Sequence, residues 1–151
     1  MAKIVDNIPT IGVISMPAKR MPEIYYASLG YGAYVNGRPM KVSAIRDTKE
    51  GTINIGQRSI RQDEKGILRR LTGQFRRLWI PGSTSEVLAK IANGQMEAAA
   101  VQDQPIWDIA PGIVLLREAQ GYVTQWDGSQ NFDVTHGKAY QQYSCHQWLS
   151  T

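Results

Sequence analysis

The chain has 151 residues, 42% of them apolar, and a formal net charge of +4. This length and composition suit one domain with a sizeable core. No apolar run approaches the ~20 residues that span a bilayer, and the start of the chain lacks the apolar stretch of a secretory signal. We therefore expect a cytoplasmic protein without a membrane segment.

The first third of the chain predicts antiparallel strands. Residues 10–15 and 23–28 are β-rich runs on either side of a polar turn. Residues 33–43 carry Asn36-Gly37 between two short β-like stretches, and this pair strongly favours a two-residue hairpin. We expect a meander of hairpins in this region.

From residue 51 onward the pattern alternates between strands and helices. We expect strands at 51–56, 75–80, 95–102, 121–126 and 139–145, and helices at 62–72, 83–93 and 108–120. Strands separated by helices require crossover connections, which place helices on the faces of a sheet. The predicted fold class is α/β, with antiparallel hairpins followed by a mixed βαβ sheet that has helices on both faces.

Basic side chains crowd residues 58–77, a stretch with only two acidic residues. Such a patch is compatible with a polyanion or nucleic-acid surface. It is also compatible with a solvated helix face, with Ile67, Leu68 and Leu71 pointing inward. We favour the solvated face and expect no nucleic-acid partner, because no nucleic-acid motif or run of stacking aromatics accompanies the charges.

The turn Gly82-Ser83-Thr84 precedes a helix with a clear apolar stripe that ends at Gly94. A glycine lets the backbone approach a ligand, and the free amides at a helix start attract anions. The alternative is a purely structural turn in which Ser85 caps the helix. The residue types leave both interpretations open.

Asp108 follows Trp107 and precedes an apolar helix that we expect to end with Gly121 in a left-handed conformation. One interpretation makes Asp108 a helix N-cap, worth ~1 kcal/mol. The other makes it a metal or phosphate ligand, because α/β folds bind ligands beyond the ends of their strands. Asp103 is close in sequence, but the following Gln104-Pro105 favours a turn there, so Asp103 ranks only as a weak second ligand.

The single cysteine, Cys145, has no internal disulfide partner. Together with His136 and His146 it makes too sparse a set, too badly spaced, for a zinc site. We expect structural roles for all three residues.

Three segments, in order, resemble the inositol monophosphatase superfamily from about residue 10 to about residue 135. Residues 12–43 are similar to its Gly-Val-Ile-x-x-Pro, Tyr-x-Ala, Gly-x-Gly-Ala and Asn-Gly elements. Residues 81–100 resemble its Gly-Ser/Thr helix start and the strand that follows that helix. Residues 107–121 resemble its Trp-Asp-x-Ala-Ala-Gly and Glu-Ala-Gly-Gly signature, with Pro111 and Gln120 as departures.

The resemblance implies a magnesium-dependent phosphomonoesterase that acts on a phosphorylated small molecule. It implies that Asp108 is a Mg2+ ligand, supported by Trp107, and that Gly82, Ser83 and Thr84 border the substrate.

The substrate class stays open. Val101 stands where inositol-specific members of the superfamily have a glutamate. Nucleotide, fructose and histidinol phosphatase branches therefore remain alternatives to an inositol phosphatase.

The family's other metal-binding elements, Gly-Glu-Glu and Asp-Pro-x-Asp-Gly-Thr, do not occur in the sequence. The chain, taken as one domain over residues 1–151, thus resembles a carboxyl-terminal half without the amino-terminal metal-binding half. We expect a truncated phosphatase that is weakly active or inactive. The alternative is a non-catalytic remnant that binds a phosphorylated metabolite or a partner protein. An exposed sheet edge or apolar face would favour a homo-oligomer in either case.

Overall fold

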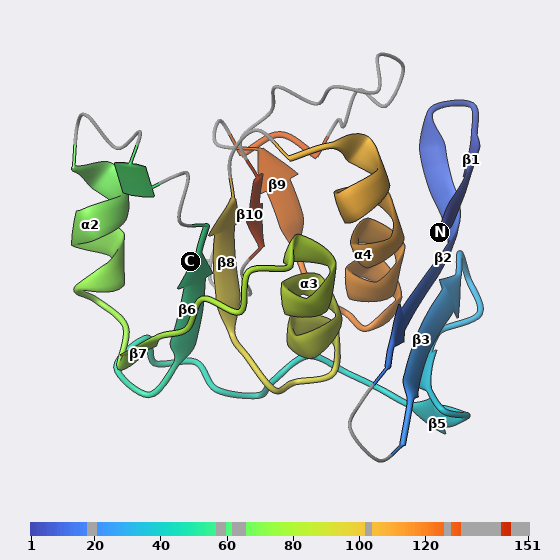
Figure 1. The fold of residues 1–151 in the computed structure, drawn as a ribbon, viewed down its shortest axis with the longest axis horizontal. Coiled ribbons are helices and arrows are strands. Elements are labelled where there is room, and N and C mark those ends of the chain that lie inside the picture. The colour runs from blue at the N-terminus through green and yellow to red at the C-terminus, as the bar shows by residue number, and fades with distance from the viewer. Residues whose placement is uncertain are drawn as a thin grey trace.

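The structure is a computed structural model that describes residues 1–17, 21–56, 60–61, 66–101, 104–125, 128–130 and 143–145. Two five-stranded sheets lie on either side of a pair of helices, α3 and α4, and a further helix, α2, covers the far face of one sheet (Figure 1). The predictions for Asp103, His136 and His146 lie outside the described residues. Cys145 ends a short strand, and its side chain is also outside the description.

The first sheet contains only antiparallel pairs, as predicted for this part of the chain. Its strands lie in the order β1 (Ala2–Val5), β2 (Ile8–Met16), β3 (Glu23–Ser28), β4 (Ala33–Val35) and β5 (Arg38–Pro39). Asn36 and Gly37 join β4 to β5 with φ values of 47° and 80°. Both residues are left-handed, as a tight hairpin turn requires, so the predicted hairpin is confirmed.

Strand β1 was not predicted. It pairs with β2 through a second tight turn at Asp6 and Asn7, whose φ values are 48° and 63°. Asp and Asn tolerate the left-handed region better than other residues that carry a side chain, which accounts for their presence in this turn.

The second sheet is mixed, also as predicted. Its strands are β6 (Thr52–Ile55), β7 (Arg77–Leu78), β8 (Ala98–Val101), β9 (Val123–Gln125) and β10 (Tyr143–Cys145), arranged in the order β7-β6-β8-β10-β9. Strand β6 runs parallel to β7 and β8, whereas β10 runs antiparallel to β8 and β9.

Helices cover both faces of the second sheet. Helix α2 (Ile67–Thr72) packs Leu68 and Leu71 against Ile53 and Ile55 on one face. Helices α3 (Thr84–Ala92) and α4 (Ile106–Glu118) fill the space between the other face and the first sheet, and they form the larger core there. The predicted α/β class with helices on both faces is confirmed. Within the described ranges, no helix combines the length and apolar character needed to cross a membrane.

Glycines allow the closest contacts of α4. A Cβ added at Gly12 in β2 would collide with the carbonyl oxygen of Pro111 and lie 3.0 Å from its Cα. A Cβ at Gly112 would lie 2.5 Å from Cβ of Leu88 in α3. The sheet and the two helices therefore touch almost backbone to backbone at these points.

The predicted ends of α4 were both wrong. Its N-cap is Pro105, and Asp108 lies in the first turn of the helix without a side-chain capping bond. The helix begins earlier because Ile106, only 8% exposed, is already part of the core. At the other end it is Gln120, with φ of 67°, that adopts the left-handed conformation predicted for Gly121. Gly121 is needed for packing instead, since an added Cβ would lie 2.8 Å from Cγ1 of Val42.

Gln120→Gly should stabilise the protein by about 0.5–1 kcal/mol, because glycine adopts the left-handed region without steric strain while adding flexibility to the unfolded chain. Urea unfolding measures this change as a higher midpoint at an unchanged slope. Gln95→Gly is the matched control, since Gln95 is exposed and its φ is not positive. The control should lose stability, and a loss of similar size in Gln120→Gly would contradict the explanation.

Candidate active site

Helices α3 and α4 lie side by side and run in the same direction (Figure 1), and their first turns are in contact. In the first turn of α3, the hydroxyl of Ser85 donates a hydrogen bond of 2.8 Å to the backbone oxygen of Asp108. One turn later, Leu88 lies against Gly112. Strand β8 ends close to the start of α4 in sequence, so the site lies at a carboxyl strand end, where α/β folds commonly bind ligands.

The turn before α3 has the backbone that its sequence predicts. Gly82 has φ of 87°, and an added Cβ would meet no atom within 4 Å. Ser83 is the N-cap, because its Oγ accepts a hydrogen bond of 3.3 Å from the backbone N–H of Glu86. The prediction that Ser85 caps this helix is therefore wrong, and the Ser85 hydroxyl bridges to α4 instead.

A second bridge connects the same two segments. The hydroxyl of Thr84 donates a hydrogen bond of 2.7 Å to Oε1 of Gln104, just before α4. The structure thus brings the turn at Gly82, Ser83 and Thr84 next to the start of the Asp108 helix. Sequence reasoning missed the roles of Ser85 and Gln104, because no local pattern indicates contacts between residues about 20 positions apart.

Asp108 is half-buried in the first turn of α4, and its backbone N–H donates to the oxygen of Pro105 at 3.0 Å. The residue is therefore not fully enclosed in the core. The N-terminal ends of two helices carry partial positive charge here, which favours anionic groups such as a carboxylate or a phosphate.

Trp107 is 65% exposed and so is not a core residue. It adjoins Asp108 in the first turn of α4, at the surface of the same helix end. Its support of Asp108 stays a prediction.

The described residues do not complete a magnesium site. Among them, no three or more His, Cys, Asp or Glu side chains cluster closely enough to hold a metal ion. Magnesium requires near-octahedral oxygen coordination, commonly from one or two carboxylates with water and substrate phosphate. Asp108 supplies one such oxygen donor, and we derive no catalytic step through a metal from this arrangement.

Among the described residues, burial shifts the pKa of Tyr25 and of Arg117. Burial, together with the hydrogen bond that Tyr25 donates to Glu23, raises the pKa of the Tyr25 phenol in β3. Burial lowers the pKa of Arg117 in the last turn of α4. Burial is the largest cause of both shifts, and for Tyr25 the negative charges of Glu23 and of Glu86, in the first turn of α3, raise the pKa further.

The basic stretch is partly described. Arg69 and Arg70 of α2 are exposed. Leu68 of the same helix packs against the second sheet and is only 4% exposed. This arrangement agrees with the solvated helix face, with Leu68 pointing inward as predicted.

The two sheets, the parallel helix pair and the glycine-serine turn beside Asp108 define a layered α/β protein of the sugar-phosphatase type. The sequence profile described as the inositol monophosphatase family matches residues 1–148. The chain belongs to the inositol monophosphatase family, as its sequence motifs predict.

Known relatives agree with this assignment. An inositol-1-monophosphatase from Mesorhizobium japonicum is 32% identical over 124 residues, which are 80% of this chain and 46% of the relative. The Nus factor SuhB of Xylella fastidiosa is 31% identical over 133 residues, or 85% of this chain and 48% of the relative. The solved inositol monophosphatase of Thermotoga maritima has a TM-score of 0.82 at 25% identity, covering 98% of this chain and 55% of that structure. The chain thus spans about half the length of the curated relatives it matches.

Proposed function

We propose that this chain is the carboxyl-terminal, substrate-side half of a magnesium-dependent phosphomonoesterase, weakly active or inactive unless further carboxylates complete its metal site. The observation that supports the proposal most directly is the contact between the two helix starts. The hydrogen bond from Ser85 to the backbone oxygen of Asp108 holds the first turn of α3 against the first turn of α4, in which Asp108 is half-buried.

In this proposal, Asp108 is one Mg2+ ligand and Trp107 supports it. Gly82, Ser83 and Thr84 border a phosphorylated small molecule. The shared N-terminal end of α3 and α4 suits such a ligand, since free amides and the partial positive charge of both helices favour phosphate oxygens. We also propose that the protein acts in the cytoplasm and forms a homo-oligomer.

The alternative is a non-catalytic protein of the same fold that binds a phosphorylated metabolite or a partner protein. The observation in its favour is the lack, among the described residues, of a cluster of three or more metal-ligating side chains. Under this alternative the same helix ends bind phosphate without cleaving it.

Asp108→Asn tests the two proposals in a phosphate-release assay with p-nitrophenyl phosphate and Mg2+. If the chain is a weak phosphatase, release should be slow and magnesium-dependent, and the substitution should lower it at least tenfold, because an amide is a poorer magnesium ligand than a carboxylate. Asp47→Asn is the matched control, since Asp47 is exposed and its carboxylate accepts a hydrogen bond of 2.9 Å from the backbone N–H of Lys49, away from α3 and α4 in the sequence.

Equal nonzero rates in the parent and Asp108→Asn would remove Asp108 from the reaction. No release from either protein, with both proteins folded by circular dichroism, would favour the non-catalytic alternative.

A further inference from the structure

The first sheet is apolar on both faces, and the described helices cover only one of them. The buried positions toward α3 and α4 include Ile14, Tyr25, Ala27, Ala33 and Val35. The alternate positions point to the opposite side, which we name the outer face, and are also mostly apolar: Ile11, Val13, Ile24, Tyr26 and Tyr34. A sheet face in water normally carries polar side chains at such positions. The pattern therefore indicates an interaction surface.

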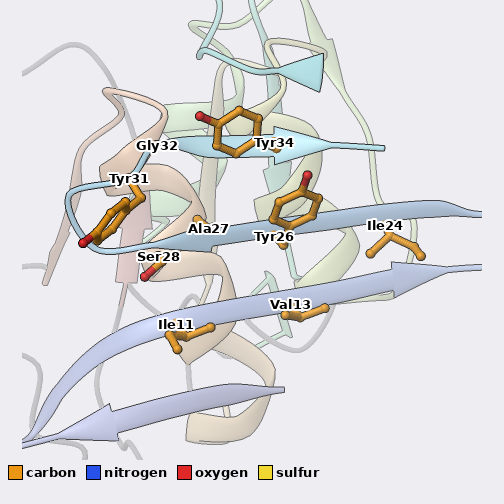
Figure 2. A pocket seen from close by; sticks show the side chains of 9 residues that line it. All are labelled: Ile11, Val13, Ile24, Tyr26, Ala27, Ser28, Tyr31, Gly32 and Tyr34. Atoms are coloured by element: carbon orange, nitrogen blue, oxygen red, sulfur yellow. The ribbon is translucent and has the colours of Figure 1, made fainter. Parts of the chain in front are cut away.

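A shallow hollow of about 420 Å³ lies on the outer face (Figure 2). The rings of Tyr26 and Tyr34, on neighbouring strands, stack with their centroids 5.6 Å apart. Tyr31, in the turn between β3 and β4, is 78% exposed, and Ile11, Ile24 and Tyr26 are 40%, 45% and 38% exposed. Together these side chains present on the order of 400 Å² of apolar surface, the size of the patches that mark binding sites for other proteins.

We propose that the outer face binds a pair of amphipathic helices from a second, different polypeptide, and that this polypeptide supplies the carboxylates missing beside Asp108. The inference rests on the proposed function, because it names the partner that completes the same site. The lengths of the relatives support a partner of this size. The chain matches 46% and 48% of the two sequence relatives described above, so about half of each relative lies beyond the matched part.

Helices fit the outer face better than other elements do. The remaining sheet faces of the described structure are all covered by helices, with α2 on one side of the second sheet and α3 and α4 between the two sheets (Figure 1). Strands lie about 4.8 Å apart, so five strands make a face about 20 Å wide. Two helices, each about 10 Å in diameter, fill this width. Strand β2, with its 9 residues, is about 30 Å long, which equals a helix of about 20 residues.

Charge favours a different polypeptide over a second copy of this chain. Lys3 in β1 pairs with Ile11, so its side chain lies on the outer face near the edge of the sheet. A second copy would bring another Lys3 and another net charge of +4 to the same contact. A helix with an acidic side chain opposite Lys3 converts this charge into an attraction. The homo-oligomer proposed above then uses a different surface.

The outer face lies close behind the candidate site. An added Cβ at Gly12 in β2 would collide with the backbone of Pro111, which lies one turn along α4 from Asp108. A polypeptide on the outer face is therefore separated from this part of α4 by a single sheet, or about 10 Å. Helix α4 also contacts the edge strand β1. A segment that leaves the outer face around this edge comes next to α4.

Co-expression of the full chain with the tagged amino-terminal half of the Mesorhizobium japonicum relative tests this proposal. The two polypeptides should elute as an equimolar complex with a dissociation constant on the order of 1 µM or lower. Tyr26→Lys should raise this constant at least a hundredfold, because it places an unpaired charge in an apolar contact. Tyr31→Ala, in an exposed turn that leaves the sheet intact, should raise it at least tenfold. Lys3→Glu should raise it several-fold, and high salt should remove this effect. Tyr122→Lys is the matched control, since Tyr122 is 48% exposed outside the first sheet, and it should leave the constant unchanged.

Absence of a complex with the parent chain would overturn the proposal. It would also be overturned by a complex that persists unchanged in folded Tyr26→Lys and Tyr31→Ala, or by a homodimer that excludes the partner and that Tyr26→Lys dissociates. A complex that responds to the variants as expected but releases no phosphate with Mg2+ would support the surface and contradict the proposed phosphatase activity alone. Slow phosphate release by the chain without any complex would contradict the surface alone.

Discussion

Gly12→Ala should lower the free energy of unfolding by about 3 kcal/mol, one of the two largest effects that we expect in this protein. The added Cβ would collide with the carbonyl oxygen of Pro111 and lie 3.1 Å from its carbonyl carbon. These are backbone atoms of α4, so no change of side-chain rotamer relieves the overlap. Either β2 or the whole helix must move, and both belong to the main core. Urea unfolding measures the loss as a lower midpoint.

Gly73→Ala is the matched control for this prediction. Gly73 has φ of −63°, and its nearest atom to an added Cβ is the oxygen of Arg70 at 3.5 Å. Alanine fits there and should change the stability by no more than about 0.5–1 kcal/mol, in the stabilising direction. A double variant, Gly12→Ala with Pro111→Ala, should keep the penalty, since the clash does not involve the proline ring. A loss below about 1 kcal/mol in Gly12→Ala would contradict the close sheet-helix contact.

The sequence predicted those elements whose signals are local. The Asn36-Gly37 hairpin, the strand at Glu23–Ser28 and the apolar stripe of α3 depend on neighbours within one turn or one strand pair. The turn at Asp6 and Asn7, between β1 and β2, is a signal of the same kind. Strand β1 itself was not predicted because it is exposed along its whole length and lacks the alternation of a half-buried strand.

The ends of α4 show why other details were not predictable. Asp108 has the residue type of a cap, yet burial of Ile106 starts the helix earlier. Gly121 is a glycine, the residue most often found in the left-handed conformation after a helix. Here, however, glycine is needed because the side chain of Val42 leaves no space for a Cβ. Gln120 then takes the strained conformation. In both cases tertiary packing overrides the local preference.

In the candidate site too, local signals were predictable and tertiary contacts were not. Its residues were identified by sequence pattern, but the contact between them was not. Ser85 reaches Asp108 only because α3 and α4 run in parallel and Gly112 lets the helices approach closely. That approach depends on packing between segments far apart in the chain, which no local periodicity encodes.

Glu118→Ala should cost about 3 kcal/mol, the second large effect. The carboxylate of Glu118 accepts hydrogen bonds from the backbone N–H groups of Gly30 at 2.9 Å and Gly32 at 2.7 Å. Hydrogen bonds to a charged acceptor are worth about 1.5–3 kcal/mol each, and partial exposure of this pair places the sum toward the lower end. An acidic residue in the last turn of a helix opposes the helix dipole, so Glu118 stabilises the protein through these bonds rather than through α4 itself.

Glu118→Gln separates the contributions of the two hydrogen bonds. The glutamine side chain keeps one acceptor oxygen, but its NH2 group replaces the other oxygen and faces a backbone N–H donor. This variant should lose about half as much stability as Glu118→Ala in urea unfolding, whereas the exposed control Glu50→Gln should change little. Gly30 and Gly32 flank Tyr31, so loss of these bonds also loosens the turn between β3 and β4. Equal stability of Glu118→Ala and the parent would show that the carboxylate does not hold this turn against α4.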